Sequence, residues 1–213
     1  MDEYLTEQEQ WEAARNWLRQ NGIWLLAGVA LAGLGLWGWR SWQARQETRL
    51  LQASGQYQQL VTAFGKNDVP TVMTLADKLS AEHSRSGYAE QAQLAAARLQ
   101  VENNQPQAAL DRLQKVMAAT SDPELALVVR LRIARLQVEQ NKADEALATL
   151  DAAEPGAFAA RFAEVRGDAL LAKGDRAGAL KAYREAQAAP GGGSGGATGG
   201  DLLALKINEL TRS

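Results

Sequence analysis

The sequence predicts an all-α protein in which a single transmembrane helix is followed by a solenoid of α-hairpins. All six Trp of the 213-residue chain lie between Trp11 and Trp42, close to its start. In the same region, the run between Arg19 and Arg40 carries no charge. From Gln43 onward the chain is rich in Ala and Leu, and its apolar residues recur at every third and fourth position, as along an amphipathic helix. The chain therefore divides into a membrane-associated part and a helical array.

Residues 1–20 form the predicted N-tail. They carry five Asp and Glu residues, and no small-residue cleavage site follows in WRSWQARQ, which argues against a cleaved signal peptide. Two Arg residues stand before the uncharged run and three shortly after it, so charge alone does not decide the orientation. Trp11, Ala14 and Leu18 give the tail an amphipathic pattern that favours the cytoplasmic side.

Residues 21–39 are predicted to cross the membrane as an uncleaved signal anchor. A helix of about 20 residues, each rising about 1.5 Å, covers about 30 Å, the thickness of the hydrocarbon core of a bilayer. Trp24 lies near one end of the run and Trp37, Trp39 and Trp42 lie near the other, as in an aromatic belt. The alternative is a buried helix of a soluble core, but such helices rarely continue this far without a charge.

One face of this predicted span consists of small residues. Gly28, Ala32 and Gly35 follow one another at helical spacing, so they share a face on which a partner helix could pack closely. The alternative is the ordinary use of Gly and Ala in membrane helices. We expect this face to be a partner-binding surface, with membrane lipid around the rest of the helix.

Residues 40–189 contain a repeated phrase at the start of every second predicted helix. The four copies are NDVPTVMTLADKL (67–79), NQPQAALDRLQKV (104–116), NKADEALATLDAA (141–153) and GDRAGALKAYREA (174–186). Aligning Val72, Ala109, Ala146 and Ala179 gives two equal spacings and a slightly shorter third. A period of about 35 residues predicts four helical hairpins, with turns at Asn67, Asn104, Asn141 and Gly174.

Small residues mark the predicted helix crossings within the hairpins. On the first helix of each hairpin, the residues that face the aligned positions are Leu60, Ala97, Ala134 and Gly167. In three hairpins both crossing residues are small, which lets the paired helices approach closely, while Leu113, Leu150 and Tyr183 fill the space above. The first hairpin departs most from the pattern, as terminal repeats usually do.

A Gly-rich linker and a last helix follow the hairpins. Residues 190–200 (PGGGSGGATGG) are predicted to be flexible, because seven of the last ten are Gly. Residues 201–213 are predicted to form a helix capped by Asp201, with Leu203, Ile207 and Leu210 in one stripe. An isolated helix of this length is marginal in water, so it either caps the open end of the array or docks on a partner. Capping is favoured, because a solenoid end otherwise exposes its core.

The sequence offers no catalytic constellation. Without Cys there is no thiolate nucleophile, and a single His, His83, has neither a second His nor a Cys to form a dyad. Gly191–Gly193 lack the Lys-Ser/Thr of a phosphate loop. The acidic pairs Asp144/Glu145 and Glu164/Asp168 have spacings typical of solvated helix faces. We therefore expect no enzyme activity, no cofactor or metal, and no small-molecule substrate.

The charge balance points to protein partners. The whole chain has a formal net charge of −2, and residues 43–213 are neutral, which gives no reason to expect nucleic acid. The concave surface of a neutral hairpin array suits proteins or peptides. Arg130, Arg132 and Arg135 form the densest basic cluster and would suit an acidic peptide or a carboxylate; the alternative is a solvated helix face.

The fourth hairpin resembles a tetratricopeptide repeat. The matching small, turn, aromatic and Pro positions are Gly167, Gly174-Asp175, Ala179, Tyr183, Ala186 and Pro190. The other three hairpins match only at small and turn positions, and two of the spacings exceed the standard period of about 34 residues. The array is therefore tetratricopeptide-like; an unrelated α-hairpin solenoid would have nearly the same shape.

The order of the parts resembles the YfgM-like family of bacterial inner-membrane proteins. The start (YLTEQEQWEAARNWLRQNGIWLLAG) and the end (LALKINEL) carry the closest likeness, and the Gly-rich residues 191–200 depart from the family. The resemblance implies a cytoplasmic N-terminus, a periplasmic repeat domain, and association with the Sec translocon and a membrane-anchored periplasmic chaperone of the parvulin type. It brings no catalytic residues. A scaffold for another envelope assembly or stress-signalling complex is the alternative.

Overall fold

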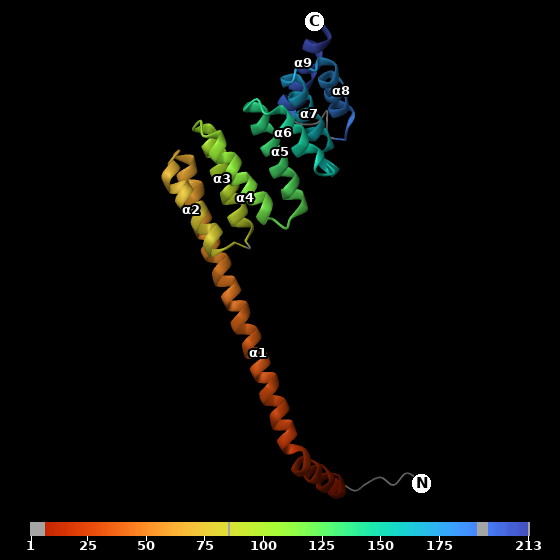
Figure 1. Ribbon diagram of the computed structural model, residues 1–213. Helices are drawn as coiled ribbons and strands as arrows, with labels where there is room; N and C mark the ends of the chain where they lie inside the picture. Colours follow the sequence, from red (N-terminus) through yellow and green to blue (C-terminus); the bar gives the residue numbers. More distant parts are fainter. Residues whose placement is uncertain (1–6, 85, 191–195, 213) are drawn as a thin grey trace, which may run out of the picture. The chain divides into compact units, whose positions relative to one another are not determined.

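Helices make up the regular structure of the computed structural model, which describes residues 7–84, 86–190 and 196–212 (Figure 1). Residues 1–6 of the predicted tail and 191–195 of the predicted linker lie outside this range. The elements are α1 Glu7–Gly65, α2 Val69–Glu82, α3 Gly87–Glu102, α4 Pro106–Ala119, α5 Pro123–Glu139, α6 Ala143–Asp151, the short 3₁₀ helix η1 Gly156–Phe158, α7 Ala159–Ala172, α8 Arg176–Ala188 and α9 Gly196–Arg212. The all-α prediction is confirmed for the described residues.

The chain divides into two compact units, and the boundary between Gln52 and Ala53 falls within α1. In the first unit α1 exposes its large apolar side chains, including Ile23 and Trp24, which are 78% and 76% exposed. Across the described part of the chain, no helix combines the length and the apolar character required of a membrane span. The span predicted over residues 21–39 is not confirmed by this criterion and stays a prediction.

The four predicted turns are confirmed. Asn67, Asn104 and Asn141 have φ angles of 55°, 58° and 60°, and Gly174 has a φ of 84°. These left-handed residues end the first helix of each hairpin in the same way: the amide of the following residue donates to the carbonyl five residues back, as in Lys142 to Gln137 at 2.8 Å. This is the Schellman pattern, in which Asn and Gly are the residues that tolerate the left-handed position.

The predicted crossing residues are buried. The first hairpin, made of α1 from Ala53 and α2, packs in one cluster with α3; the others are α3–α4, α5–α6 and α7–α8, which lie side by side in Figure 1. Leu60, Ala97 and Ala134 on the first helices, and Val72, Ala109, Ala146 and Ala179 on the second helices, are each at most 2% exposed. Small or well-matched residues at these positions let the helices of each hairpin pack closely.

The fourth hairpin has a close approach at Gly167, which faces the ring of Tyr183. A Cβ at Gly167 would lie 2.5 Å from Cδ1 of Tyr183 and nearer still to Cε1, so only Gly fits beneath this ring. Tyr183 is 1% exposed, and its hydroxyl donates a hydrogen bond of 2.7 Å to Asp168. Burial raises the pKa of Tyr183, and the neighbouring Asp168 raises it further, so the phenol stays protonated and donates.

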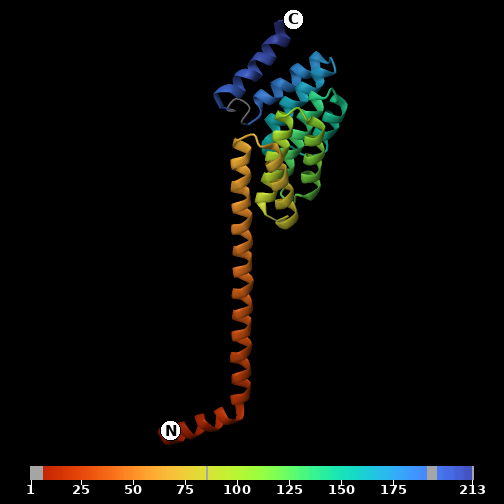
Figure 2. The same cartoon turned by 90° about the vertical axis from the view of Figure 1, so that its left-hand side faces the viewer.

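The last helix packs against the fourth hairpin. Leu203 is 4% exposed and clusters with Ala179, Tyr183 and Ala186, while Ile207 and Leu210 pack against the same cluster. Figure 2 shows α9 beside α8 at this end of the array. The helix begins at Gly196, ahead of the predicted boundary at Asp201, so the linker is shorter than expected. Once packing holds residues 201–212, each added N-terminal residue only extends an existing helix, which is far less costly than nucleating one.

Candidate functional site

The small-residue face of α1 is open. Gly28, Ala32 and Gly35 are all exposed, and a Cβ added at Gly28 or Gly35 would meet nothing within 4 Å. The described part of the chain therefore leaves this face uncovered. Its role as a partner-binding surface stays a prediction.

The structure separates the three arginines that the sequence grouped together. Arg130 is half-buried, and its Nη1 donates a hydrogen bond of 3.0 Å to the carbonyl of Thr149 on α6. Arg132 and Arg135 are exposed and line one groove with residues of α3. Arg130 therefore joins the two helices of its hairpin, while Arg132 and Arg135 remain at a surface.

We define the α3–α5 groove by the eight residues that line it, with a volume of about 360 Å³. They are Ala97, Arg98, Val101, Glu102, Leu113, Arg132, Arg135 and Leu136. Half of them are apolar: Ala97, Leu113 and Leu136 are buried and Val101 is half-buried. The groove thus combines an apolar floor with a charged rim contributed by two helices that begin neighbouring hairpins.

The charged rim carries more positive than negative groups. Arg98 donates a hydrogen bond of 2.7 Å to Glu102, its neighbour on α3, and its guanidinium lies 5.5 Å from the ring centroid of Phe64. Partial desolvation in the groove lowers the pKa of Arg132, although its side chain is exposed, and the charges of Arg135 and Arg98 lower it further. The three guanidinium groups therefore repel one another, and Glu102 is the one carboxylate that lines the groove.

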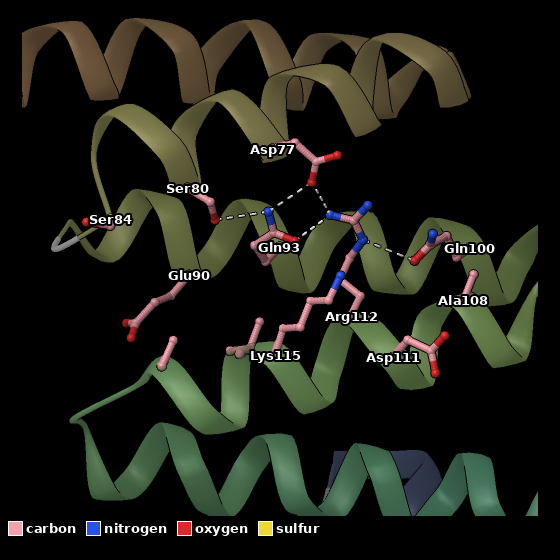
Figure 3. Close-up of a pocket in the computed structure, with 12 residues that line it drawn as sticks. Asp77, Ser80, Ser84, Glu90, Gln93, Gln100, Ala108, Asp111, Arg112 and Lys115 are labelled. Atoms are coloured by element: carbon pink, nitrogen blue, oxygen red, sulfur yellow. Dashed lines mark hydrogen bonds and ion pairs between the residues drawn. The ribbon is translucent and has the colours of Figure 1, made fainter.

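A second, more polar cavity of about 600 Å³ lies among α2, α3 and α4 (Figure 3). Arg112, whose side chain is 14% exposed, occupies its wall. Its Nη1 donates a 2.7 Å bond to Asp77 on α2 and a short bond to Gln93 on α3, while its Nε donates to Gln100 at 3.2 Å. One guanidinium thereby ties the second helix of the first hairpin to both helices of the second hairpin.

Gln93 completes this network. Its amide nitrogen donates to the Ala76 carbonyl at 2.9 Å, to Ser80 at 3.0 Å and to Asp77 at 3.3 Å. Burial acts to raise the pKa of Asp77, but hydrogen bonds from Arg112 and Gln93 outweigh it, and the pKa lies below the ordinary carboxyl value. Because these groups satisfy one another, we interpret the cavity wall as a joint between two hairpins.

The remaining residues singled out from the sequence occupy structural positions. His83 ends α2, where its backbone amide donates to the Leu79 carbonyl. Asp144 forms an ion pair with Lys173. Lys206 of α9 forms ion pairs with both Glu164 and Asp168. Within residues 7–84, 86–190 and 196–212, no group of three or more His, Cys, Asp or Glu side chains is placed to hold a metal ion.

Fold and grooves together define a helical-repeat scaffold. A family model described as "Tetratricopeptide repeat-like domain" matches residues 15–212. An Escherichia coli (strain K12) protein named "Ancillary SecYEG translocon subunit" is 37% identical over 86% of this chain and 88% of its own length. Proteins of the same name from Haemophilus influenzae and Neisseria gonorrhoeae are each 28% identical, over 97% and 99% of this chain and 98% and 100% of their own.

The chain belongs to the family of these YfgM-like proteins, which carry the tetratricopeptide repeat-like domain. The resemblance found in its two ends is thereby confirmed and extends over almost the whole chain. No solved structure gives a significant match.

Proposed function

We propose that this protein is an ancillary subunit of the SecYEG translocon and acts by binding and positioning other proteins. The observation that carries the proposal is the match of 86% of the chain, at 37% identity, to a relative with that name. The array supports it, because stacked hairpins provide extended surfaces for protein binding.

In this proposal residues 21–39 anchor the chain in the inner membrane. The tail, residues 1–20, lies in the cytoplasm, and the repeat domain, residues 40–189, lies in the periplasm. The uncharged run and the exposure of its large apolar side chains support an apolar surrounding, since exposed apolar surface of this extent is unfavourable in water. The exposed side chains are Ile23, Trp24, Leu31, Leu34, Leu36, Trp37 and Trp39.

The repeat domain then holds a membrane-anchored periplasmic chaperone of the parvulin type near the translocon exit. Anchoring both proteins in one membrane raises their effective concentration, so modest affinity suffices. The charge balance of residues 43–213 supports a protein partner, because a neutral surface neither repels acidic proteins nor attracts polyanions over long range.

Site-specific photocrosslinking in the intact membrane tests the translocon association. A photoreactive residue at Ala32, on the small-residue face, is expected to capture a SecYEG subunit. The same residue at Ala30 is the matched control, because it is also exposed but lies on the other side of the helix. The proposal is overturned if neither position captures a translocon subunit and the repeat domain captures no chaperone. Capture of another envelope complex instead would support the alternative scaffold.

The absence of Cys allows the orientation to be tested with single introduced thiols. Ser84→Cys lies in the exposed turn after α2, and Glu12→Cys lies in the exposed tail. A membrane-impermeant maleimide added outside spheroplasts is expected to label the first variant at once and the second only after lysis. The reverse pattern would overturn the proposed topology.

A further inference from the structure

The α3–α5 groove remains without a role once the array, its cap and the Arg112 joint have been explained. We propose that this groove binds a short peptide segment in which an acidic side chain stands next to an apolar one. The acidic group would lie against Arg132 and Arg135, and the apolar side chain would lie on the floor formed by Ala97, Val101 and Leu136. This assignment does not depend on the translocon association.

Charge complementarity identifies the acidic part of the ligand. Glu102 is engaged by Arg98. Among the described residues, no hydrogen bond or ion pair reaches the guanidinium of Arg132 or Arg135. Their mutual repulsion is relieved by a carboxylate, and a guanidinium binds a carboxylate through two parallel N–H donors. Arg132 and Arg135 can therefore bind one or two carboxylates in the groove.

The floor identifies the apolar part of the ligand. Leu113 from α4 clusters with Ala97 and Leu136, and the half-buried Val101 packs against them. A site for a bare anion would gain nothing from four apolar side chains, whereas an aliphatic side chain removed from water on this floor contributes to affinity. The volume of about 360 Å³ is at the small end of ligand sites, which span about 300–1,000 Å³, so the occupant is a few residues long.

A polyanion is a poor fit to the same surface. Nucleic acid is bound by stripes of basic residues that follow its backbone, and residues 43–213 have as many acidic as basic side chains. Of the three arginines that line the groove, Arg98 is already engaged by Glu102 and lies over the ring of Phe64. The groove therefore suits a short acidic peptide segment.

The test is a binding titration with the purified full chain in a neutral detergent. The probe is a rhodamine-labelled peptide that contains two Leu residues. Each Leu is flanked by Asp or Glu, and Gly residues stand at the two ends of the peptide. Binding is measured by fluorescence anisotropy. A matched probe carries Asn and Gln in place of the acids. We expect the acidic probe to bind at least about tenfold more tightly than the neutral probe, with an affinity that falls as salt is added.

Variants assign the binding to the groove. Arg132→Gln/Arg135→Gln is expected to weaken the acidic probe about tenfold, whereas the matched control Arg184→Gln, an exposed arginine of α8, leaves it unchanged. Val101→Thr keeps the shape of the floor but adds a hydroxyl, and it is expected to weaken binding about threefold. Circular dichroism of each variant reports whether the fold is kept.

Three results would overturn the inference. The first is equal affinity for the acidic and neutral probes. The second is an Arg132→Gln/Arg135→Gln protein that keeps its fold and its full affinity. The third is displacement of the probe by single-stranded DNA or inorganic polyphosphate at concentrations below that of the unlabelled peptide, which would assign the groove to polyanions instead.

Discussion

The first and fourth hairpins have the same left-handed turn, yet at the aligned buried positions of their two helices they carry large and small residues in the opposite order. In the first hairpin Leu60 on α1 meets the cluster that contains Val72 and Ala76 of α2, and all three are fully buried. In the fourth, Gly167 on α7 leaves room for Tyr183 of α8, one helical turn after Ala179. A large residue on one helix is matched by a small one on the other.

The two middle hairpins lie between these extremes. They place Ala97 with Leu113, and Ala134 with Leu150, at the same two positions. From the first to the fourth hairpin, the residue on the first helix becomes smaller as the residue on the second helix becomes larger. What the repeats share is therefore the volume at the crossing, as close packing of a core requires, more than the type of any one residue.

The largest expected effect is a residue that exceeds this volume in the fourth hairpin. Gly167→Leu places a branched side chain where even a Cβ would lie 2.5 Å from Cδ1 of Tyr183. We expect the free energy of unfolding to fall by about 4 kcal/mol, at the upper end of single-substitution effects. Urea denaturation of the full chain in detergent, followed by circular dichroism, measures it as a shift in midpoint.

A second substitution distinguishes excess volume from other causes. Tyr183→Ala in the Gly167→Leu protein recreates the pairing of Leu60 with Ala76, so we expect it to recover about half of the loss. Recovery is partial because the hydrogen bond from Tyr183 to Asp168 is gone. If the double variant is less stable than either single variant, the volume argument is wrong.

The converse change in the first hairpin tests the same comparison from the other side. Leu60→Ala leaves a cavity at a fully buried position and is expected to cost about 3 kcal/mol. Adding Ala76→Leu recreates the pairing of the middle hairpins and is expected to restore most of the stability. The control is Ala76→Leu alone, which is expected to destabilise by overpacking against Leu60. Additive effects of the two changes would contradict the prediction.

The comparison also explains which parts of the fold were predictable. Asn67, Asn104, Asn141 and Gly174 were recognisable as turns because few residue types adopt a left-handed backbone. The first hairpin looked divergent because Leu60 replaces a small residue, although its packing partner compensates. The start of α9 at Gly196 was missed because packing of Leu203, farther along the helix, outweighs the poor helix propensity of Gly.

Only part of the α3–α5 groove could be predicted from the sequence. Arg132 and Arg135 lie one helical turn apart on one helix face, whereas Arg130 lies about 200° around the helix from Arg132 and turns to Thr149. Helical spacing alone could have excluded Arg130. Arg98 was missed because it lies on a different helix, far from Arg132 along the sequence, and its place in the groove depends on how α3 packs beside α5.

The two end hairpins also differ in the charged contact that joins each to its neighbour. In the fourth, Lys206 of α9 donates a 2.7 Å bond to Asp168 and lies 5.4 Å from the ring centroid of Tyr183. Lys206→Met keeps the aliphatic part of the side chain but removes the charge. We therefore expect the free energy of local opening of α9 to fall by about 1 kcal/mol. Hydrogen exchange of the α9 amides measures this.

The matched control for this change is Lys181→Met on the exposed face of α8. The Lys181 side chain is 81% exposed and contacts Glu185 of its own helix at 4.0 Å, so exchange in α9 is expected to stay unchanged. Equal exchange in the two variants would mean that the apolar contacts of Leu203 hold α9 without help from Lys206.

In the first hairpin the corresponding contact joins Asp77 to Arg112 of the next hairpin, and it is expected to have the smallest effect. The pKa of Asp77 is lowered in the folded chain, so its contribution is present above the ordinary carboxyl pKa of about 3.9 and is lost as the pH falls through the folded value. Because the Asp77 side chain is 64% exposed, solvent screening limits the effect to about 0.5 kcal/mol.

Asp77→Asn is therefore expected to be less stable than the natural chain at pH 7, and this difference is expected to narrow at pH 3, because the pH has then fallen below the ordinary carboxyl pKa and toward the lowered pKa of Asp77. Asp111→Asn is the matched control: this carboxylate lines the same cavity but accepts its hydrogen bond from Gln107 on its own helix, at 2.9 Å. Urea midpoints at both pH values measure the difference. If the difference in urea midpoint between the natural chain and Asp77→Asn is the same at pH 3 as at pH 7, then Asp77 joins the hairpins by shape and neutral hydrogen bonds, and its charge contributes nothing.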